Sequence, residues 1–368
     1  MRKGPATTAI LLGLISTYLL LWPVPVDPVS WRAPVDRGYV GPFASNDLLK
    51  SASGIDLGGF EGPEDATRGS DGRLYVTTAS GAILSIQDRG VSEFDNAGGR
   101  PLGIETDYDG SLLVANAHAG IQRITEDGLV TTILDTIDQR QLENANNLAI
   151  GPDGIIYFSQ SSSKFTAAEF GGSYKASLLD ILEHGGHGNV YAFDPATGSA
   201  RRLISGLNYA NGVAISEDGS YLIIAETGNY RILKHWLEGD SEGDTLVLID
   251  NLPGFPDNIK SGLDGRFWIG FAAPRNELID RLSDKPFLRK VIQRLPASIR
   301  PKAVPFSHVI AINGDGDVVM NLHDPLARIP TLTGVLETED SIYLTTLFGD
   351  QLARVSKRQL QQQRQMTR

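Results

Sequence analysis

Six positions in the chain share one spacing, and four of them carry side chains that bind hard cations. Glu64, in the stretch "EGPEDATRGSDGRLYV", lies seven residues before the pair Asp71-Gly72. The same spacing before an Asp-Gly or Asp-Ser pair recurs five more times. The residues at this position are Glu64, Leu102, Asn146, Asn211, Asp257 and Thr333. Carboxylate and amide oxygens, present at four of the six, are the ligands that hard cations prefer.

The four oxygen-bearing side chains form a donor set that fits Ca²⁺. They belong to Glu64, Asn146, Asn211 and Asp257. Two carboxylates balance the charge of the ion, and two amides add neutral oxygens toward the about 6–8 ligands that Ca²⁺ takes. Zinc and copper fit poorly, because the set contains no histidine and the chain contains no cysteine. Asn211-Gly212 alone is also typical of a turn, and Asp257 alone of a strand cap, but their recurrence at one spacing favours calcium.

The repeat itself predicts a fold that brings these residues together. A short, mostly apolar strand follows each turn pair, and successive pairs lie 38, 44, 65, 46 and 76 residues apart. Units of about 40 to 45 residues with short strands are typical of β-propeller blades. The sequence therefore predicts an all-β fold, a six-bladed β-propeller whose innermost strands line a central channel. The six equivalent positions then converge on one axis, and each Asp-Gly pair forms a hairpin turn with positive φ at both residues.

Two of the gaps are too long for one blade and indicate insertions at residues 161–189 and 274–306. The first has a helical pattern at 176–182 and two histidines, His184 and His187. In the second, apolar residues between 278 and 295 recur at the spacing of an amphipathic helix or helix pair. Three roles stay open for these short helical insertions: docking onto the propeller, covering the channel mouth as a lid, or lying against a membrane.

Residues 1–30 have the pattern of a membrane anchor. Arg2 and Lys3 precede 23 uncharged residues with the apolar centre "AILLGLISTYLLLW". Such a segment can cross the ~30 Å hydrocarbon core of a bilayer. A cleaved signal peptide is the alternative. The basic residues at the N-terminal side predict a single-pass transmembrane helix with the propeller on the non-cytoplasmic side, in a periplasm, a lumen or the exterior.

The rest of the chain divides into a tether at 31–55, the propeller at 56–356 and a polar tail at 357–368. A single propeller accounts for most of the 368 residues. The formal net charge of −11 and the pI near 5.1 argue against nucleic acid as a partner. The lack of cysteine excludes disulfide bonds and thiol chemistry.

Several stretches resemble the six-bladed calcium propellers of the gluconolactonase, paraoxonase and strictosidine synthase-like superfamily. The resemblance covers about residues 56–355 and is closest to the strictosidine synthase-like branch that includes the adipocyte plasma membrane-associated protein. It is carried by the strings "EGPEDA", "GRPLGIETD", "IYFSQSSSKF", "ANGVAISEDGSYLIIAETGNYRI" and "LPGFPDNI". In calcium-dependent members a Glu, two Asn and an Asp hold the metal, and by motif these fall on the same four residues. Paraoxonases add a further Asn, which Asn258 matches.

The chain departs from the family pattern at two positions. Paraoxonases have a histidine where this chain has Leu102, although His118 in "ANAHAG" falls near the second member of their histidine pair. The catalytic glutamate of strictosidine synthase aligns with Thr333. Condensation of an amine with an aldehyde is therefore the least favoured chemistry.

The resemblance implies a calcium-dependent hydrolase that acts on a small-molecule lactone or a carboxylic ester, including aryl esters. Asp257 would be both metal ligand and general base toward water, or a nucleophile as in the fluorophosphatase relatives. Asn146 and Asn211 would also orient the substrate oxygen. His118 is a candidate second base, and Arg275 is a candidate partner for an anionic substrate group. The alternative is a membrane-tethered propeller that binds a ligand or partner without catalysis.

Overall fold

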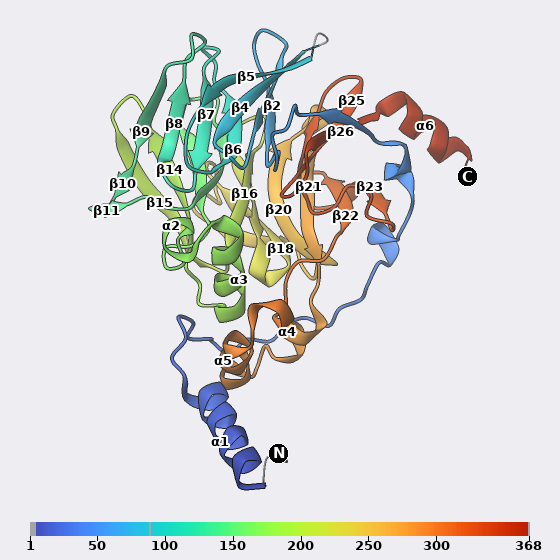
Figure 1. Ribbon diagram of the computed structural model, residues 1–368. Coiled ribbons are helices and arrows are strands. Elements are labelled where there is room, and N and C mark those ends of the chain that lie inside the picture. The colour runs from blue at the N-terminus through green and yellow to red at the C-terminus, as the bar shows by residue number, and fades with distance from the viewer. Residues whose placement is uncertain (1–4, 88–89, 367–368) are drawn as a thin grey trace.

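The computed structural model describes residues 5–87 and 90–366 and confirms the six-bladed β-propeller. Six four-stranded antiparallel sheets surround a central axis (Figure 1). The first strand of each blade contacts the first strand of the next, and the first strands of blades 6 and 1 also meet. These six strands therefore form the inner wall of a closed ring.

Blade 1 contains β2 (Ala66–Arg68), β3 (Leu74–Thr77), β4 (Ala82–Gln87) and β5 (Gly90–Asn96). Blade 2 contains β6 (Pro101–Thr106), β7 (Leu112–Asn116), β8 (Gly120–Ile124) and β9 (Val130–Leu134). Blade 3 contains β12 (Ala145–Ile150), β13 (Ile156–Gln160), β14 (Gly188–Asp194) and β15 (Ser199–Leu207). Blade 4 contains β16 (Ala210–Ile215), β17 (Tyr221–Glu226), β18 (Arg231–Trp236) and β19 (Thr245–Ile249). Blade 5 contains β20 (Gly254–Ser261), β21 (Phe267–Pro274), β22 (Ser307–Ile312) and β23 (Val318–Asp324).

Blade 6 joins the two ends of the propeller. Its strands are β24 (Leu332–Glu337), β25 (Ser341–Thr346), β26 (Gln351–Ser356) and, from the N-terminal side, β1 (Ser53–Asp56). Strand β1 pairs antiparallel with β26, with Ser53 opposite Arg354. Helix α6 (Lys357–Met366) follows β26, and its Leu360 is buried in the same cluster as Leu49. The ring of blades cannot open without breaking these contacts. A small hairpin, β10 (Thr136–Ile137) and β11 (Arg140–Gln141), follows blade 2.

Four of the five Asp-Gly turns differ from the predicted hairpin type, whereas in the fifth both Asp264, with a φ of 56°, and Gly265, with a φ of 70°, have the predicted positive φ. In the turn before β3, Gly72 has a φ of 81° and its N–H donates to the carbonyl of Gly69 at 2.9 Å, while Asp71 does not have positive φ. The same pattern recurs at Gly110, Gly154 and Gly219. The glycine is thus the fourth residue of the turn, and only this residue needs the left-handed conformation. The aspartate stabilises the turn through its side chain, because Asp71 Oδ1 accepts the backbone N–H of Arg73 at 2.9 Å.

The hydrophobic cores lie between neighbouring blades. Between blades 4 and 5, for example, Ile223 and Ile232 share one buried cluster with Ile269 and Ile310. Stacked sheets bury side chains on both faces of each strand, which makes the inner wall rigid. Side chains at the ends of the innermost strands are therefore held in fixed positions.

Both insertions form helices, as the sequence predicts, and the helices gather with α1 (Pro5–Leu21) at one end of the propeller (Figure 1). They are α2 (Ala167–Phe170), α3 (Ser173–Glu183), α4 (Glu277–Arg281) and α5 (Pro286–Arg294). Thr166 and Asn276 cap α2 and α4 by accepting backbone N–H groups, and Pro286 begins α5. We call the two segments 166–184 and 276–304 the roof.

One buried guanidinium ties the roof to the residues before the tether. Arg289 of α5 is fully buried and donates to the carbonyl of Leu182 in α3 at 2.9 Å and to the carbonyl of Val29, just before the tether. Arg294, at the end of the same helix, donates to the carbonyl of Trp22, just after α1, at 2.5 Å. Two insertions that are far apart in the sequence are thus fixed together with the segment that follows α1.

The predicted transmembrane helix within residues 1–30 is not supported. Helix α1 has 17 residues and ends at Leu21. At about 1.5 Å per residue this is shorter than the ~30 Å core of a bilayer. Within residues 5–87 and 90–366, no helix is long and apolar enough to cross a membrane.

His184, at the end of α3, holds Trp31 of the tether. The two rings are stacked with their centroids 3.9 Å apart, and His184 Nε2 shares a hydrogen bond of 3.0 Å with Asn229 Oδ1. Burial lowers the pKa of His184 to about 3, and the charges of Arg289 and Arg231 act in the same direction. The folded protein therefore keeps this imidazole neutral.

We expect the tether to detach in acid. The pKa of His184 is lower in the folded protein than the ~6.5 of an unfolded chain, so its contribution to stability is complete above pH ~6.5 and is lost as the pH falls toward 3. At pH 4.5 the loss is about 2–3 kcal/mol. Hydrogen exchange of the Val29 and Trp31 amides, which donate to carbonyls of the roof, should show protection factors about 100-fold lower at pH 4.5 than at pH 7. The variant His184→Gln should lack most of this pH dependence, and an equal loss in the variant would contradict the assignment.

Candidate active site

The six predicted positions lie at or beside the start of the innermost strands, and β-bulges displace most of them. We call these six residues the ring: Glu64, Leu102, Asn146, Asn211, Asp257 and Thr333. In blades 2 to 6 the register between the first two strands shifts at this point. In blade 3, Ala145 and Leu148 pair with β13, whereas Asn146 and Asn147 between them do not. A bulge bends the strand and changes the direction of its side chains. Here it frees two adjacent polar residues from the sheet at one end of the channel.

A close approach of two strands explains the glycine after Asn211. A Cβ on Gly212 would lie 2.1 Å from the backbone nitrogen of Ile259 in β20, so no side chain fits there. This approach brings Asn211 beside Asp257, and Asn211 Nδ2 donates to Asp257 Oδ1 at 2.6 Å. The sequence pair Asn211-Gly212 is thus part of a strand contact in the ring rather than a turn.

Four predicted ligands line one cavity of about 780 Å³. They are Glu64, Asn146, Asn211 and Asp257, and each is at most 6% exposed. Leu102, from blade 2, lines the same cavity. The roof supplies mostly apolar walls, and its basic lining residues are Lys175, Arg300 and Lys302. The structure therefore joins the ring to both insertions around a single chamber.

The two carboxylates of the ring are buried close to each other. Burial raises the pKa of Glu64 to about 7, against the opposing effect of Arg100, whose Nη2 lies 2.5 Å from Glu64 Oε2. Burial, and after it the charge of Glu64, raises the pKa of Asp257 well above its ordinary value. A cation between two such carboxylates would stabilise their ionised forms.

The amides of the ring also fit a cation. Asn211 Oδ1 is buried without a hydrogen-bond partner, and so is Asn258 Oδ1. A buried acceptor without a partner destabilises the folded protein by about 1–3 kcal/mol, so a cation that bound to either oxygen would remove this cost. Within the described ranges no group of three His, Asp or Glu side chains could hold a metal. A metal at the ring would therefore use amide and carboxylate oxygens together, and this donor set fits Ca²⁺.

Asn258 and Thr333 hold the backbone of Glu64 in place. Asn258 Nδ2 donates to the carbonyl of Glu64 at 3.1 Å, and Thr333 Oγ1 donates to the same oxygen at 2.7 Å. Thr333 is fully buried. The position that aligns with the strictosidine synthase glutamate thus carries a hydroxyl that is already bonded to the backbone.

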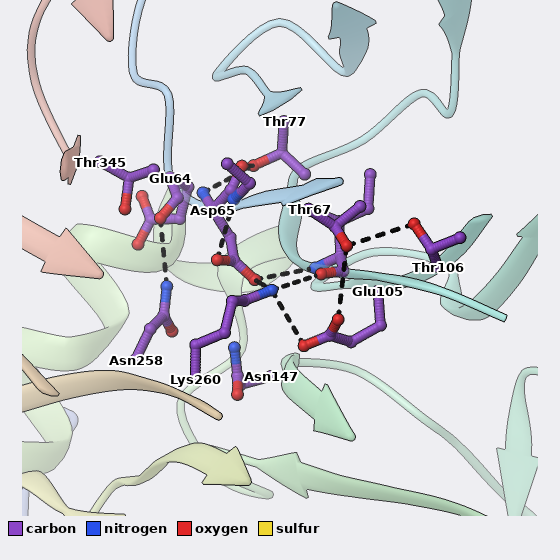
Figure 2. Close-up of polar contacts among 12 residues, drawn as sticks. Glu64, Asp65, Thr67, Thr77, Glu105, Thr106, Asn147, Asn258, Lys260 and Thr345 are labelled. Atoms are coloured by element: carbon purple, nitrogen blue, oxygen red, sulfur yellow. Dashed lines mark hydrogen bonds and ion pairs between the residues drawn. The ribbon is translucent and has the colours of Figure 1, made fainter. Parts of the chain in front are cut away.

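A second buried network lies beside the ring and is shown in Figure 2. Lys260 Nζ lies 3.1 Å from Asp65 Oδ2 and 3.0 Å from Glu105 Oε1, and it donates to the carbonyl of Ile104 at 2.7 Å. Burial raises the pKa of Asp65 and of Glu105. Burial alone would lower the pKa of Lys260, but the two carboxylates outweigh it and raise that pKa. The ammonium group is therefore an internal cation for two acids, the buried Asp65 and the partly buried Glu105.

Two predicted site residues lie apart from the ring. His118 is exposed and lines a separate cavity beside Arg100. Arg275 borders the main cavity, but its Nε donates to Asp280 Oδ2 at 3.0 Å and its Nη2 to the carbonyl of Pro34 at 2.5 Å. Arg275 thus connects α4 to the tether. The roles of His118 as a base and of Arg275 as an anion partner stay predictions.

Arg100 and Tyr209 belong to the site although no repeat in the sequence points to them. Tyr209 lines the cavity, is buried, and has a φ of 62°. Bulky residues seldom adopt this conformation, and such strain is concentrated at functional sites. Burial raises the pKa of the Tyr209 phenol above its ordinary value. Its single sequence signal is its place two residues before Asn211.

Comparison with known proteins places the chain in one family. The family model described as strictosidine synthase matches residues 146–240, and the model of the strictosidine synthase-like N-terminal region matches residues 41–86. Strictosidine synthase-like protein 6 of Arabidopsis thaliana is 31% identical over 302 residues, which cover 79% of this chain and 79% of the relative. The chain belongs to the strictosidine synthase-like family. The adipocyte plasma membrane-associated protein of Bos taurus is 29% identical to the present chain over 373 residues, which cover 95% of this chain and 88% of the relative.

Solved structures share the fold at low sequence identity. A gluconolactonase from Xanthomonas campestris has a TM-score of 0.61 and 17% identity, and the match covers 90% of this chain and 96% of that one. Regucalcin from Agrobacterium tumefaciens, a calcium-binding protein, has a TM-score of 0.56 and 13% identity, and the match covers 82% and 93%. At this level of identity the likeness shows the fold alone.

Proposed function

We propose that this strictosidine synthase-like protein is a calcium-dependent hydrolase of lactones or carboxylic esters, aryl esters included. The observation that carries the proposal is the ring, in which four oxygen-bearing side chains from four blades line one cavity. The unpaired Asn211 Oδ1 adds to it. Support also comes from the gluconolactonase and the calcium-binding regucalcin that share the fold.

In this proposal the four predicted ligands of the ring would hold Ca²⁺, which would act as a Lewis acid toward the carbonyl oxygen of the substrate. Asp257 accepts a proton from the water that attacks the carbonyl carbon, and this proton later passes to the leaving alkoxide. The Asn211 amide, which donates to Asp257 Oδ1, fixes the orientation of the carboxylate. Asp257 therefore ends each turnover in the ionised form in which it began.

The cavity indicates the class of substrate. Its walls include Leu178, Leu182 and Ile279 of the roof, which suit an apolar acyl or aryl group. A negatively charged substituent would meet Lys175 or Lys302, because the guanidinium of Arg275 is already engaged. We expect medium-sized apolar esters and lactones to be hydrolysed faster than small polar ones.

We also propose that α1 attaches the protein to a membrane, with the propeller on the non-cytoplasmic side. Apolar side chains of α1 are exposed, with Leu21 at 74% and Ile10 at 65%. Some relatives are named for the plasma membrane. Flotation of the full chain with vesicles tests this attachment, and removal of residues 1–22 should abolish it.

One observation favours a second candidate function, a membrane-tethered propeller that binds a ligand without catalysis. Arg100 already supplies a positive charge to Glu64 of the ring, so the ring is partly neutralised without a metal. A cavity of about 780 Å³ also has the size of a small-molecule binding site.

Two measurements on the full chain in mild detergent separate the two functions. Calorimetric titration with Ca²⁺ tests the ring, and a panel of lactones and aryl esters, with and without chelator, tests catalysis. Turnover that chelator removes and Ca²⁺ restores supports the hydrolase. Calcium binding without turnover across the panel supports the binding protein, and no response to Ca²⁺ in either measurement rejects the metal site.

A further inference from the structure

Arg100 occupies an unusual place for a cation, since it lies against a ligand of the proposed metal site. The residue stands directly before β6 and is 9% exposed. Its Nη2 lies 2.5 Å from Glu64 Oε2, whereas its Nη1 has only a long bond of 3.4 Å to the carbonyl of Gly62. The ion pair with Glu64 is thus the main bond of this guanidinium.

Because Glu64 is a proposed metal ligand, Arg100 and a metal ion would compete for its carboxylate. Glu64 and Asp257 are the carboxylates of the ring, and Arg100 neutralises one of them. A divalent ion that takes Glu64 as a ligand must share this carboxylate with the guanidinium or displace it. Two cations on one carboxylate repel each other strongly in a buried site. An ion would therefore bind more tightly if Arg100 were absent.

The structure also offers a place for a displaced guanidinium. Arg100 borders a second cavity of about 620 Å³, next to the main one. Two exposed acids, Glu61 and Asp350, line this second cavity. Tyr174 and Leu347 line both cavities, and Arg100 borders the second cavity while its guanidinium pairs with Glu64 of the main one. A side-chain rotation could move the guanidinium from Glu64 toward these acids without opening the blades.

We propose that Arg100 is a positioning residue that sets the cation affinity of the ring by competing for Glu64. In the absence of an ion it holds Glu64 as an ion pair. When an ion binds, Glu64 exchanges this bond for the metal, and the guanidinium turns toward Glu61 and Asp350. This inference rests on the proposed function, because it takes the ring as the cation site.

Calorimetric titration of the full chain with Ca²⁺ tests this competition, with Arg100→Gln as the main variant. We expect its affinity for Ca²⁺ to be at least ~10-fold higher than that of the wild type, with the same stoichiometry. Arg100→Lys keeps the charge and should stay within about threefold of the wild type. Arg202→Gln, which removes an exposed arginine paired with Asp138, is the matched control and should change nothing.

Thermal unfolding in chelator gives a second readout. Arg100→Gln should unfold at a lower temperature than the wild type, because Glu64 loses its partner, and Ca²⁺ should raise its midpoint more than that of the wild type. Unchanged or weaker affinity in a folded Arg100→Gln, or a tenfold gain in Arg100→Lys, would overturn the inference and leave the hydrolase standing. Tighter binding in Arg100→Gln without turnover in either protein would support the inference and reject the hydrolase. If neither protein binds Ca²⁺, both fail.

Discussion

Replacing Asp257 with asparagine is expected to lower the affinity for Ca²⁺ by at least ~100-fold and to abolish ester hydrolysis. The change removes one of the two charges of the ring and also the general base. Asparagine has nearly the same shape, and its oxygen can still accept the Asn211 amide that now bonds Asp257 Oδ1 at 2.6 Å. The loss would therefore report on charge and basicity rather than on packing.

The stability of Asp257→Asn separates these effects from unfolding. Burial and the charge of Glu64 raise the pKa of Asp257, so its ionised form is costly in the metal-free protein. In chelator the variant should be at least as stable as the wild type, whereas in Ca²⁺ it should lose the stabilisation that the wild type gains. Asp264→Asn, in the same blade and with a side chain that is 83% exposed, is the control. Full calcium affinity in Asp257→Asn would remove this residue from the site.

The ring could be predicted from the sequence because one spacing joins each turn to the start of an innermost strand. The polar pairs that follow from it, such as Asn146 with Asn147 and Asp257 with Asn258, extend the same signal by one residue. The bulges at these positions depend on pairing between strands, which the spacing does not encode. The role of Arg100 could not be predicted for a related reason, because its contact with Glu64 joins two neighbouring blades.

The insertions and the N-terminus show a different limit. Helical periodicity predicted both insertions but left their role open, and the shared cavity depends on contacts such as the bond from Arg289 to Leu182. At the N-terminus an apolar run predicted a spanning helix, but α1 ends at Leu21. Trp22 is followed by Pro23, and a residue before proline disfavours the helical conformation. The uncharged run is thus longer than the helix it forms.

Replacing Lys260 with methionine is expected to destabilise the protein by about 3–5 kcal/mol. Lys260 is the shared partner of the buried Asp65 and the partly buried Glu105, at 3.1 and 3.0 Å, and methionine would leave both acids without a cation. Methionine fills much of the same volume, so the loss would come mainly from charge. Chemical denaturation in chelator measures it without interference from the ring.

Two comparisons decide whether charge is the cause. Lys234→Met removes another buried lysine, one that donates to the Gly314 carbonyl at 3.1 Å and lies over two aromatic rings. Among the described residues, Lys234 forms no ion pair with a carboxylate. Its cost should be about 1 kcal/mol. Adding Glu105→Gln to Lys260→Met should recover about 1–2 kcal/mol, because one of the two unpaired acids then becomes neutral. Equal losses for the two lysine variants, or no recovery in the double variant, would show that the Lys260 network stabilises the channel through packing alone.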